Sequence, residues 1–114
     1  MTETGIFNAI VKKWDIIEDY DSSCIVIKLQ FQSSIGYVDF SFNICYLQKI
    51  FSILDITSIS QIKNQPCVIF VKDGLFKDMG SFLFYHYKDF ELEENSWLFC
   101  SDIKNYYNEL DNII

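Results

Sequence analysis

The residues with the clearest chemical potential are four cysteines and one histidine, which could form a zinc site or a nucleophilic pair. They are Cys24, Cys45, Cys67, Cys100 and His86. Structural zinc sites usually draw ligands from close pairs, such as two cysteines separated by two residues, and the sequence has no such pair. A nucleophilic cysteine needs a neighbouring base, but His86 lies in an aromatic stretch that is more typical of a packed strand. We therefore expect reduced thiols and no metal, cofactor or catalytic residue.

Carboxylates form two clusters that could bind a cation or a partner. The first comprises Asp15, Glu18, Asp19 and Asp21, and the second comprises Asp89, Glu91, Glu93 and Glu94. Neither has the ligand spacing and central glycine of an EF-hand loop, so exposed acidic loops are the simplest interpretation. Aromatic residues border the second cluster, as they do in protein interfaces, although they could equally belong to the core. The candidate partner-binding residues are therefore Asp89, Phe90, Glu91, Glu93, Glu94 and Trp97.

The charge balance restricts the class of partner. The chain carries 16 acidic and 9 basic residues, all of the latter lysine, for a net charge of -7. Nucleic-acid-binding proteins usually present a basic face and use arginine for bidentate contacts, so direct DNA or RNA binding is disfavoured. We expect a basic protein partner instead. The alternative is that the charge only keeps the protein in solution and that the missing arginine reflects an AT-rich genome.

Length and hydropathy indicate one domain, spanning residues 1–114. Half of the 114 residues are hydrophobic and 18% are aromatic, which is enough for one core. The sequence has no apolar run of the ~20 residues that cross a bilayer, and its beginning lacks the basic and apolar regions of a secretion signal. We therefore expect a cytoplasmic protein with no membrane contact.

The elements that must position these residues begin with strands. Apolar and polar residues alternate over 24–32 and again over 37–43, which predicts a hairpin through the turn at 33–36. Residues 6–17 have a mixed period; a long first strand is slightly favoured over a helix. Residues 67–72 are apolar on both faces, as in a buried strand. Asp73 and Gly74 then form a favoured hairpin turn into a further strand within 75–87.

Helical spacing appears in two places. Leu47, Ile50, Phe51 and Leu54 lie at i, i+3, i+4 and i+7, which predicts a helix over 44–54 packed across the sheet. Residues 57–63 are typical of a short capped turn ended by Asn64, and residues 101–114 predict a C-terminal helix. The predicted fold is therefore α+β: a small antiparallel sheet of about 4–5 strands with a central packed helix and a C-terminal helix.

The middle of the chain resembles a family of small phage and prophage proteins of unknown function. The resemblance spans Tyr46 to Leu83 and is carried by Leu47, Ile50, Leu54, Ile56, the stretch 58–63, the stretch 66–71, Asp73, Gly74, and Gly80 to Leu83. The sequence departs from the family pattern where only Gly36 remains of a glycine-rich segment, and where Asn64 replaces a glycine. The resemblance implies a phage-type origin, and small phage proteins of this size often inhibit host defence systems.

Three functions are therefore in competition. The first is a phage-encoded inhibitor of a bacterial defence nuclease, similar to an anti-CRISPR protein, whose carboxylates bind a basic nucleic-acid groove in place of phosphates. The second is an immunity protein or antitoxin that neutralises a basic toxin. The third is a module that sequesters a small ligand such as a nucleotide signal, which the lack of arginine and of a glycine-rich loop disfavours. An enzyme ranks below all three.

Overall fold

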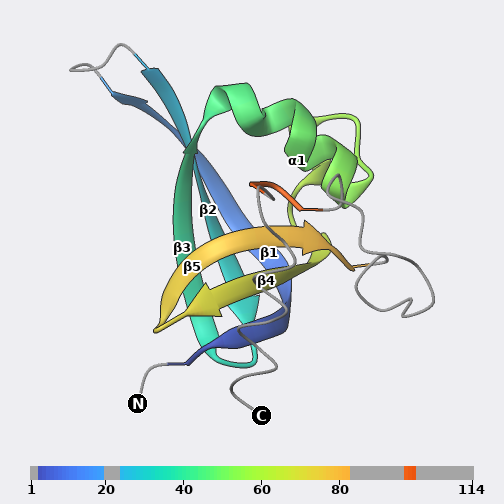
Figure 1. Ribbon diagram of the computed structural model, residues 1–114. Helices are drawn as coiled ribbons and strands as arrows, with labels where there is room; N and C mark the ends of the chain where they lie inside the picture. The colour runs from blue at the N-terminus through green and yellow to red at the C-terminus, as the bar shows by residue number, and fades with distance from the viewer. Residues whose placement is uncertain (1–2, 20–23, 83–96, 100–114) are drawn as a thin grey trace.

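The computed structural model describes residues 3–19, 24–82 and 97–99, and these build one antiparallel sheet with a short helix (Figure 1). The strands are β1 (Gly5–Asp19), β2 (Cys24–Ser33), β3 (Gly36–Asn43), β4 (Pro66–Lys72) and β5 (Leu75–Ser81). Their order in the sheet is β3-β2-β1-β4-β5. The longest strand, β1, is therefore central, and both hairpins attach to it.

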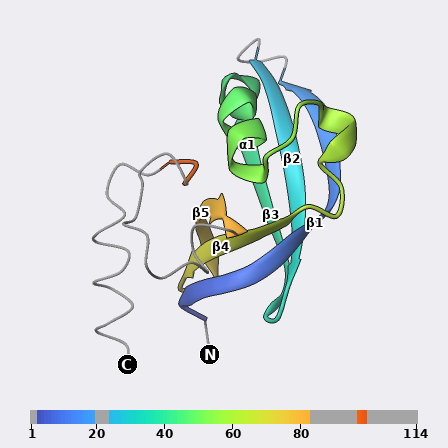
Figure 2. The same ribbon diagram turned by 90° about the vertical axis from the view of Figure 1, so that its right-hand side faces the viewer.

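A change of partner along β1 gives the sheet its curl. The first part of β1 pairs with β4, from Gly5 opposite Val71 to Ile10 opposite Pro66. The later part pairs with β2 as far as Asp19, and a bulge interrupts that pairing between Val11 and Lys13. A bulge bends its strand and increases the local twist. The two halves of β1 consequently run in different directions, as Figure 2 shows.

The curl brings the two outer strands toward each other. The ring centroids of Phe40 on β3 and Phe76 on β5 lie 4.2 Å apart, and those of Phe31 and Phe76 lie 5.5 Å apart. Stacked aromatic side chains thus fill the space between the sheet edges. A five-stranded, partly open antiparallel barrel is also the architecture of the OB-fold, which serves several unrelated functions.

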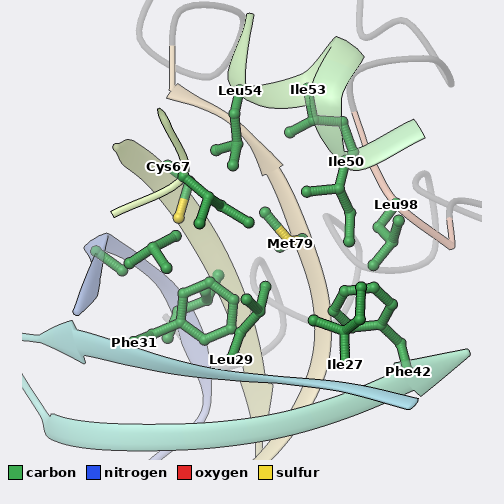
Figure 3. Packing of buried hydrophobic residues seen from close by; sticks show 14 of the residues in the cluster. Ile27, Leu29, Phe31, Phe42, Ile50, Ile53, Leu54, Cys67, Met79 and Leu98 are labelled. Carbon is green, nitrogen blue, oxygen red and sulfur yellow. The ribbon is translucent and has the colours of Figure 1, made fainter. Parts of the chain in front are cut away.

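The helical segment packs across one opening of the curled sheet. A 3-10 turn at Ile44–Tyr46 leads into α1 (Leu47–Leu54). The side chain of Asn43 accepts a hydrogen bond from the Cys45 N–H at its start, and Asp55 takes the left-handed conformation at its end. Helix α1 directs three buried side chains toward the strands: Ile50, Ile53 and Leu54. Figure 3 shows these side chains above the core side chains that the strands contribute.

Two turns behave as their residue types predict. Asp73 and Gly74 both have positive φ, 53° and 78°, as a two-residue hairpin turn requires. The short 3-10 helix η2 (Ile59–Gln61) begins with a capping box, in which the Gln61 side chain accepts from the Ser58 N–H at 3.0 Å. It is followed by Asn64, whose φ of 68° is the left-handed conformation that asparagine tolerates better than most residues.

Most of the predicted elements are confirmed. The helix over 44–54, both hairpins and the long first strand are present, and the sheet has five strands. The described residues are nevertheless mainly β, because the helix is short and the strands are long. The predicted sheet and packed helix are therefore confirmed, but the predicted α+β balance is not. The C-terminal helix predicted over 101–114 lies outside the described residues. Within the described part of the chain, no helix is both long enough and apolar enough to span a bilayer.

Candidate partner-binding surface

Most of the predicted partner-binding residues lie outside the part of the chain that the structure describes. These are Asp89, Phe90, Glu91, Glu93 and Glu94. Trp97 is described, and only 2% of its surface is exposed. Its indole therefore belongs to the interior of the protein in this structure.

Trp97 occupies the space left by a glycine. Gly80 on β5 forms an isolated antiparallel bridge with Trp97, and a Cβ built on Gly80 would lie 2.8 Å from Cδ2 of the indole. The next two residues are fixed to the same strand. Leu98 N–H donates to the Met79 carbonyl at 2.8 Å, and Phe99 N–H donates to Oδ1 of the buried Asp78 at 2.9 Å. This part of the second aromatic and acidic region thus contributes to folding.

A more exposed surface lies at the far end of the β1–β2 hairpin. The pairing of β2 with β3 ends at Val26, which is opposite Asn43, in the described residues. From there β1 and β2 continue as a two-stranded ribbon that projects past α1 (Figure 1). Three isoleucines on this ribbon are strongly exposed: Ile16 (53%), Ile17 (45%) and Ile25 (41%). We call these residues, with the neighbouring Asp15 and Glu18, the distal ribbon.

The register shows how the distal ribbon exposes apolar groups on both faces. Ile16 lies opposite the fully buried Ile27, and Ile25, two residues before Ile27, extends the same face beyond the core. Ile17 is opposite Val26 and belongs to the other face. Other exposed apolar residues, such as Tyr37 and Leu75, stand singly on β3 and β5. Single exposures are ordinary, whereas a cluster rimmed by polar residues is typical of a contact surface.

Carboxylates border the isoleucines of the distal ribbon. The side chains of Asp15 and Glu18 are both exposed. The sequence continues from there into Asp19 and Asp21, while the nearest lysines of β1, Lys12 and Lys13, stand at the bulge. Lys28 of β2 lies opposite Asp15, whereas Ile25 lies opposite Glu18, so among the described side chains of the ribbon Glu18 is the carboxylate without a lysine across from it. The alternation over 24–32 puts Ile25 on the same face as Ile27, Leu29 and Phe31, but these three are fully buried and Ile25 is exposed.

The outer face of β1, β2 and β3 carries charges of both signs. Lys28 Nζ lies 4.0 Å from Asp39 Oδ2, and both side chains are about half exposed (46% and 51%). Lys13 and Asp15 stand next to them around a small hollow of about 100 Å³. OB-type barrels bind oligonucleotides on the face of strands 2 and 3. Here, lysines and aspartates on that face offset each other, which does not provide the basic surface that phosphates require.

A larger hollow of about 850 Å³ lies beside the first half of β1. Its described lining is apolar or carries uncharged amides and hydroxyls: Ile6, Phe7, Asn8, Ala9, Ile10, Gln32, Ser33, Ser34, Pro66 and Phe82. A nucleotide would need cationic or clustered backbone donors for its phosphates, and these lining residues include no charged side chain. The hollow therefore gives the nucleotide-signal hypothesis no support.

The thiols and carboxylates do not assemble into a reactive centre within the described residues. Cys67 is fully buried, and this burial raises the pKa of its thiol to about 12, so the reactive thiolate does not form near neutral pH. Cys45 is exposed and Cys24 is half-buried. Among the described residues, no three or more His, Cys, Asp or Glu side chains lie together in a group that could hold a metal ion.

Comparisons with protein families, curated proteins and solved structures find no match to this chain. The surfaces of the fold itself are therefore the guide to function. Among those described, the distal ribbon combines exposed apolar side chains with an acidic border. It is our candidate partner-binding surface.

Proposed function

We propose that this protein acts by stoichiometric binding of a basic protein partner, and that the distal ribbon is a contact surface. The observation that carries the proposal is the group of three exposed isoleucines on a projecting two-stranded ribbon bordered by carboxylates. Burial of these side chains provides affinity, since removing apolar surface from water stabilises a complex by about 25 cal/mol per Å². The acidic border provides orientation and partner choice.

The net charge of -7 extends this preference to the whole molecule. A strongly acidic protein attracts a basic groove at long range and repels other acidic surfaces. The partner class favoured by the phage-type resemblance is a bacterial defence nuclease whose nucleic-acid groove the protein blocks, in the manner of an anti-CRISPR protein. This places the proposed action in the cytoplasm of a host cell. A basic toxin would satisfy the same charge requirement, and the experiment below separates the two.

The test is a titration of purified defence nucleases and of purified basic toxins with this protein, with target cleavage or toxin activity as the readout. For a stoichiometric inhibitor we expect activity to fall linearly and to reach its minimum at one equivalent of protein. The partner that responds identifies the class. Progressive loss of activity at far lower ratios would instead indicate an enzyme and contradict the proposal.

The contribution of the distal ribbon is tested with a pair of matched variants. Ile17→Ser with Ile25→Ser removes two exposed apolar side chains from the ribbon, whereas Leu75→Ser removes one that is 66% exposed on β5. We expect the ribbon variant to weaken binding by about tenfold or more, because central apolar contacts dominate the affinity of an interface. The Leu75 variant should bind like the unmodified protein. Equal binding by all three proteins would exclude the ribbon as the contact.

A further inference from the structure

The distal half of β1 has an open edge. β1 pairs with β4 only from Gly5 to Ile10, and the last backbone contacts on that side join Val11 to Asn64 and Gln65. From Lys13 to Asp19 the other side of β1 continues to pair with β2. Within the described residues, no strand pairs with β1 on the β4 side over this stretch. A strand edge of this kind is a template for the addition of a further strand.

The register shows which backbone groups face this open edge. Antiparallel residues alternate between pairs that exchange hydrogen bonds and pairs that do not. Ser33 and Gly36 flank the two-residue turn between β2 and β3 and therefore form a hydrogen-bonded pair. The odd-numbered residues of β2 thus direct their backbone groups toward β3. The even-numbered residues, from Gln32 back to Cys24, direct theirs toward β1. Their partners in β1 beyond the bulge are Lys13, Asp15, Ile17 and Asp19.

The intervening residues Trp14, Ile16 and Glu18 therefore direct their backbone N–H and C=O groups away from β2. The bonds of Val11 to Asn64 and Gln65 agree with this alternation, because Val11 is opposite Phe31 in a pair that does not bond. Among the described residues, no hydrogen bond occupies the edge groups of these three residues. They are spaced as an added strand requires.

Other edges of the sheet are less accessible. The Trp97–Phe99 segment bonds to β5 through Met79 and Asp78. On the opposite side of the sheet, Phe40 of β3 stacks on Phe76 of β5. The edge of distal β1 thus combines unpaired backbone with exposed apolar side chains.

We infer that the partner binds by adding an extended, basic and apolar segment as a strand along residues 14–18 of β1. This inference rests on the proposed function, since it specifies how the basic partner is held. An added strand would place apolar side chains beside Ile16 and Ile17 and basic ones beside Asp15 and Glu18, and opposite charges on neighbouring strands stabilise their pairing. A second copy of the protein fits less well, because it would bring its own net charge of -7 to the same edge.

The inference can be tested with a synthetic peptide and isotope-labelled full-length protein. The probe is a blocked octapeptide of two Lys-Val-Val-Lys repeats, whose order matches Asp15, Ile16, Ile17 and Glu18. It is titrated by nuclear magnetic resonance at low salt. We expect the amide hydrogens of Trp14, Ile16 and Glu18 to exchange about tenfold more slowly in the complex, because they gain hydrogen bonds. The amides of Asp15 and Ile17, already bonded to β2, are the internal control and should change much less.

A second peptide tests the backbone contact itself. N-methylation of two consecutive central residues blocks both edges of the peptide without changing its charge, and we expect it to weaken binding by about tenfold, because several hydrogen bonds are lost. Equal binding of the methylated peptide would overturn strand addition while leaving the basic-partner proposal intact. Protection at β3 or β5 would also overturn it, and so would protection that grows with protein concentration alone, which would assign the edge to a second copy.

The same experiment also tests the proposed preference for a basic partner. A third peptide of two Glu-Val-Val-Glu repeats should not bind, because its charge has the same sign as that of the ribbon. Binding of this acidic peptide as tight as that of the lysine peptide, or no binding of either basic peptide, would contradict the preference for a basic partner as well as the strand addition.

Discussion

The burial of Trp97 depends on the absence of a side chain at Gly80. The indole lies against the backbone of β5 at a point where any side chain would collide with it. Trp97 was a candidate contact residue because aromatic residues next to acids are frequent in interfaces. The same composition also describes a large side chain held in the interior, and the glycine opposite it selects the second outcome.

We predict that Gly80→Ala destabilises the protein by about 1–3 kcal/mol, the usual cost of forcing extra volume into a packed interior. The cause is steric, since Gly80 does not have the positive φ that itself penalises alanine. Urea denaturation followed by tryptophan fluorescence measures the change. In a Trp97→Phe background the same substitution should cost less, because the smaller ring leaves room for the methyl group. Equal costs in both backgrounds would show that the two residues are not coupled.

At the scale of elements, α1 and the bulge in β1 have complementary roles. The bulge redirects β1 so that the sheet curls around the core, and α1 then covers the opening with Ile50, Ile53 and Leu54. The distal ribbon extends past this cover. Ile16 and Ile25 consequently continue the pattern of a core-facing strand but remain in solvent. The exposed surface of the ribbon is therefore a product of the relative lengths of β1, β2 and α1.

We predict that Ile50→Ala and Leu54→Ala each destabilise the protein by about 2–5 kcal/mol, because each leaves a cavity in the core. Phe51→Ala should cost less, since Phe51 is only half-buried against the cluster. Ser52→Ala on the exposed side of the same helix is the matched control and should change the free energy of unfolding by less than about 0.5 kcal/mol. Chemical denaturation distinguishes the four variants. Losses as small as the control's at both Ile50 and Leu54 would refute the packing of α1.

For the molecule as a whole, two acidic regions could guide a basic partner. One is the distal ribbon with Asp15 and Glu18, whose exposed position the structure shows. The other is the cluster that contains Glu91, Glu93 and Glu94, outside the described residues. Charges on both regions contribute to the long-range attraction, but only those at the contact alter the lifetime of the complex strongly.

We predict that Asp15→Lys with Glu18→Lys weakens partner binding more than Glu91→Lys with Glu93→Lys and Glu94→Lys, although the triple variant changes the net charge further. Binding of the unmodified protein should also weaken as salt is raised, because the Debye length is only ~8 Å at physiological ionic strength. Association and dissociation rates measured across a salt series, with circular dichroism as the folding control, test both expectations. A larger effect of the triple variant on dissociation would place the contact at the second acidic region.

The sequence by itself determined the local elements of this protein. Alternation over residues 24–43, the Asp73–Gly74 turn and the helical spacing from Leu47 to Leu54 are local patterns, and a local pattern needs no knowledge of distant residues. It also identified the carboxylates of the ribbon as a group. Tertiary structure decided which side chains are covered. Trp97 is buried because its segment pairs with β5 at Gly80. Ile25 is exposed because it lies on the ribbon that projects past α1 (Figure 1). Neither outcome follows from spacing, since burial depends on which distant segments pack together.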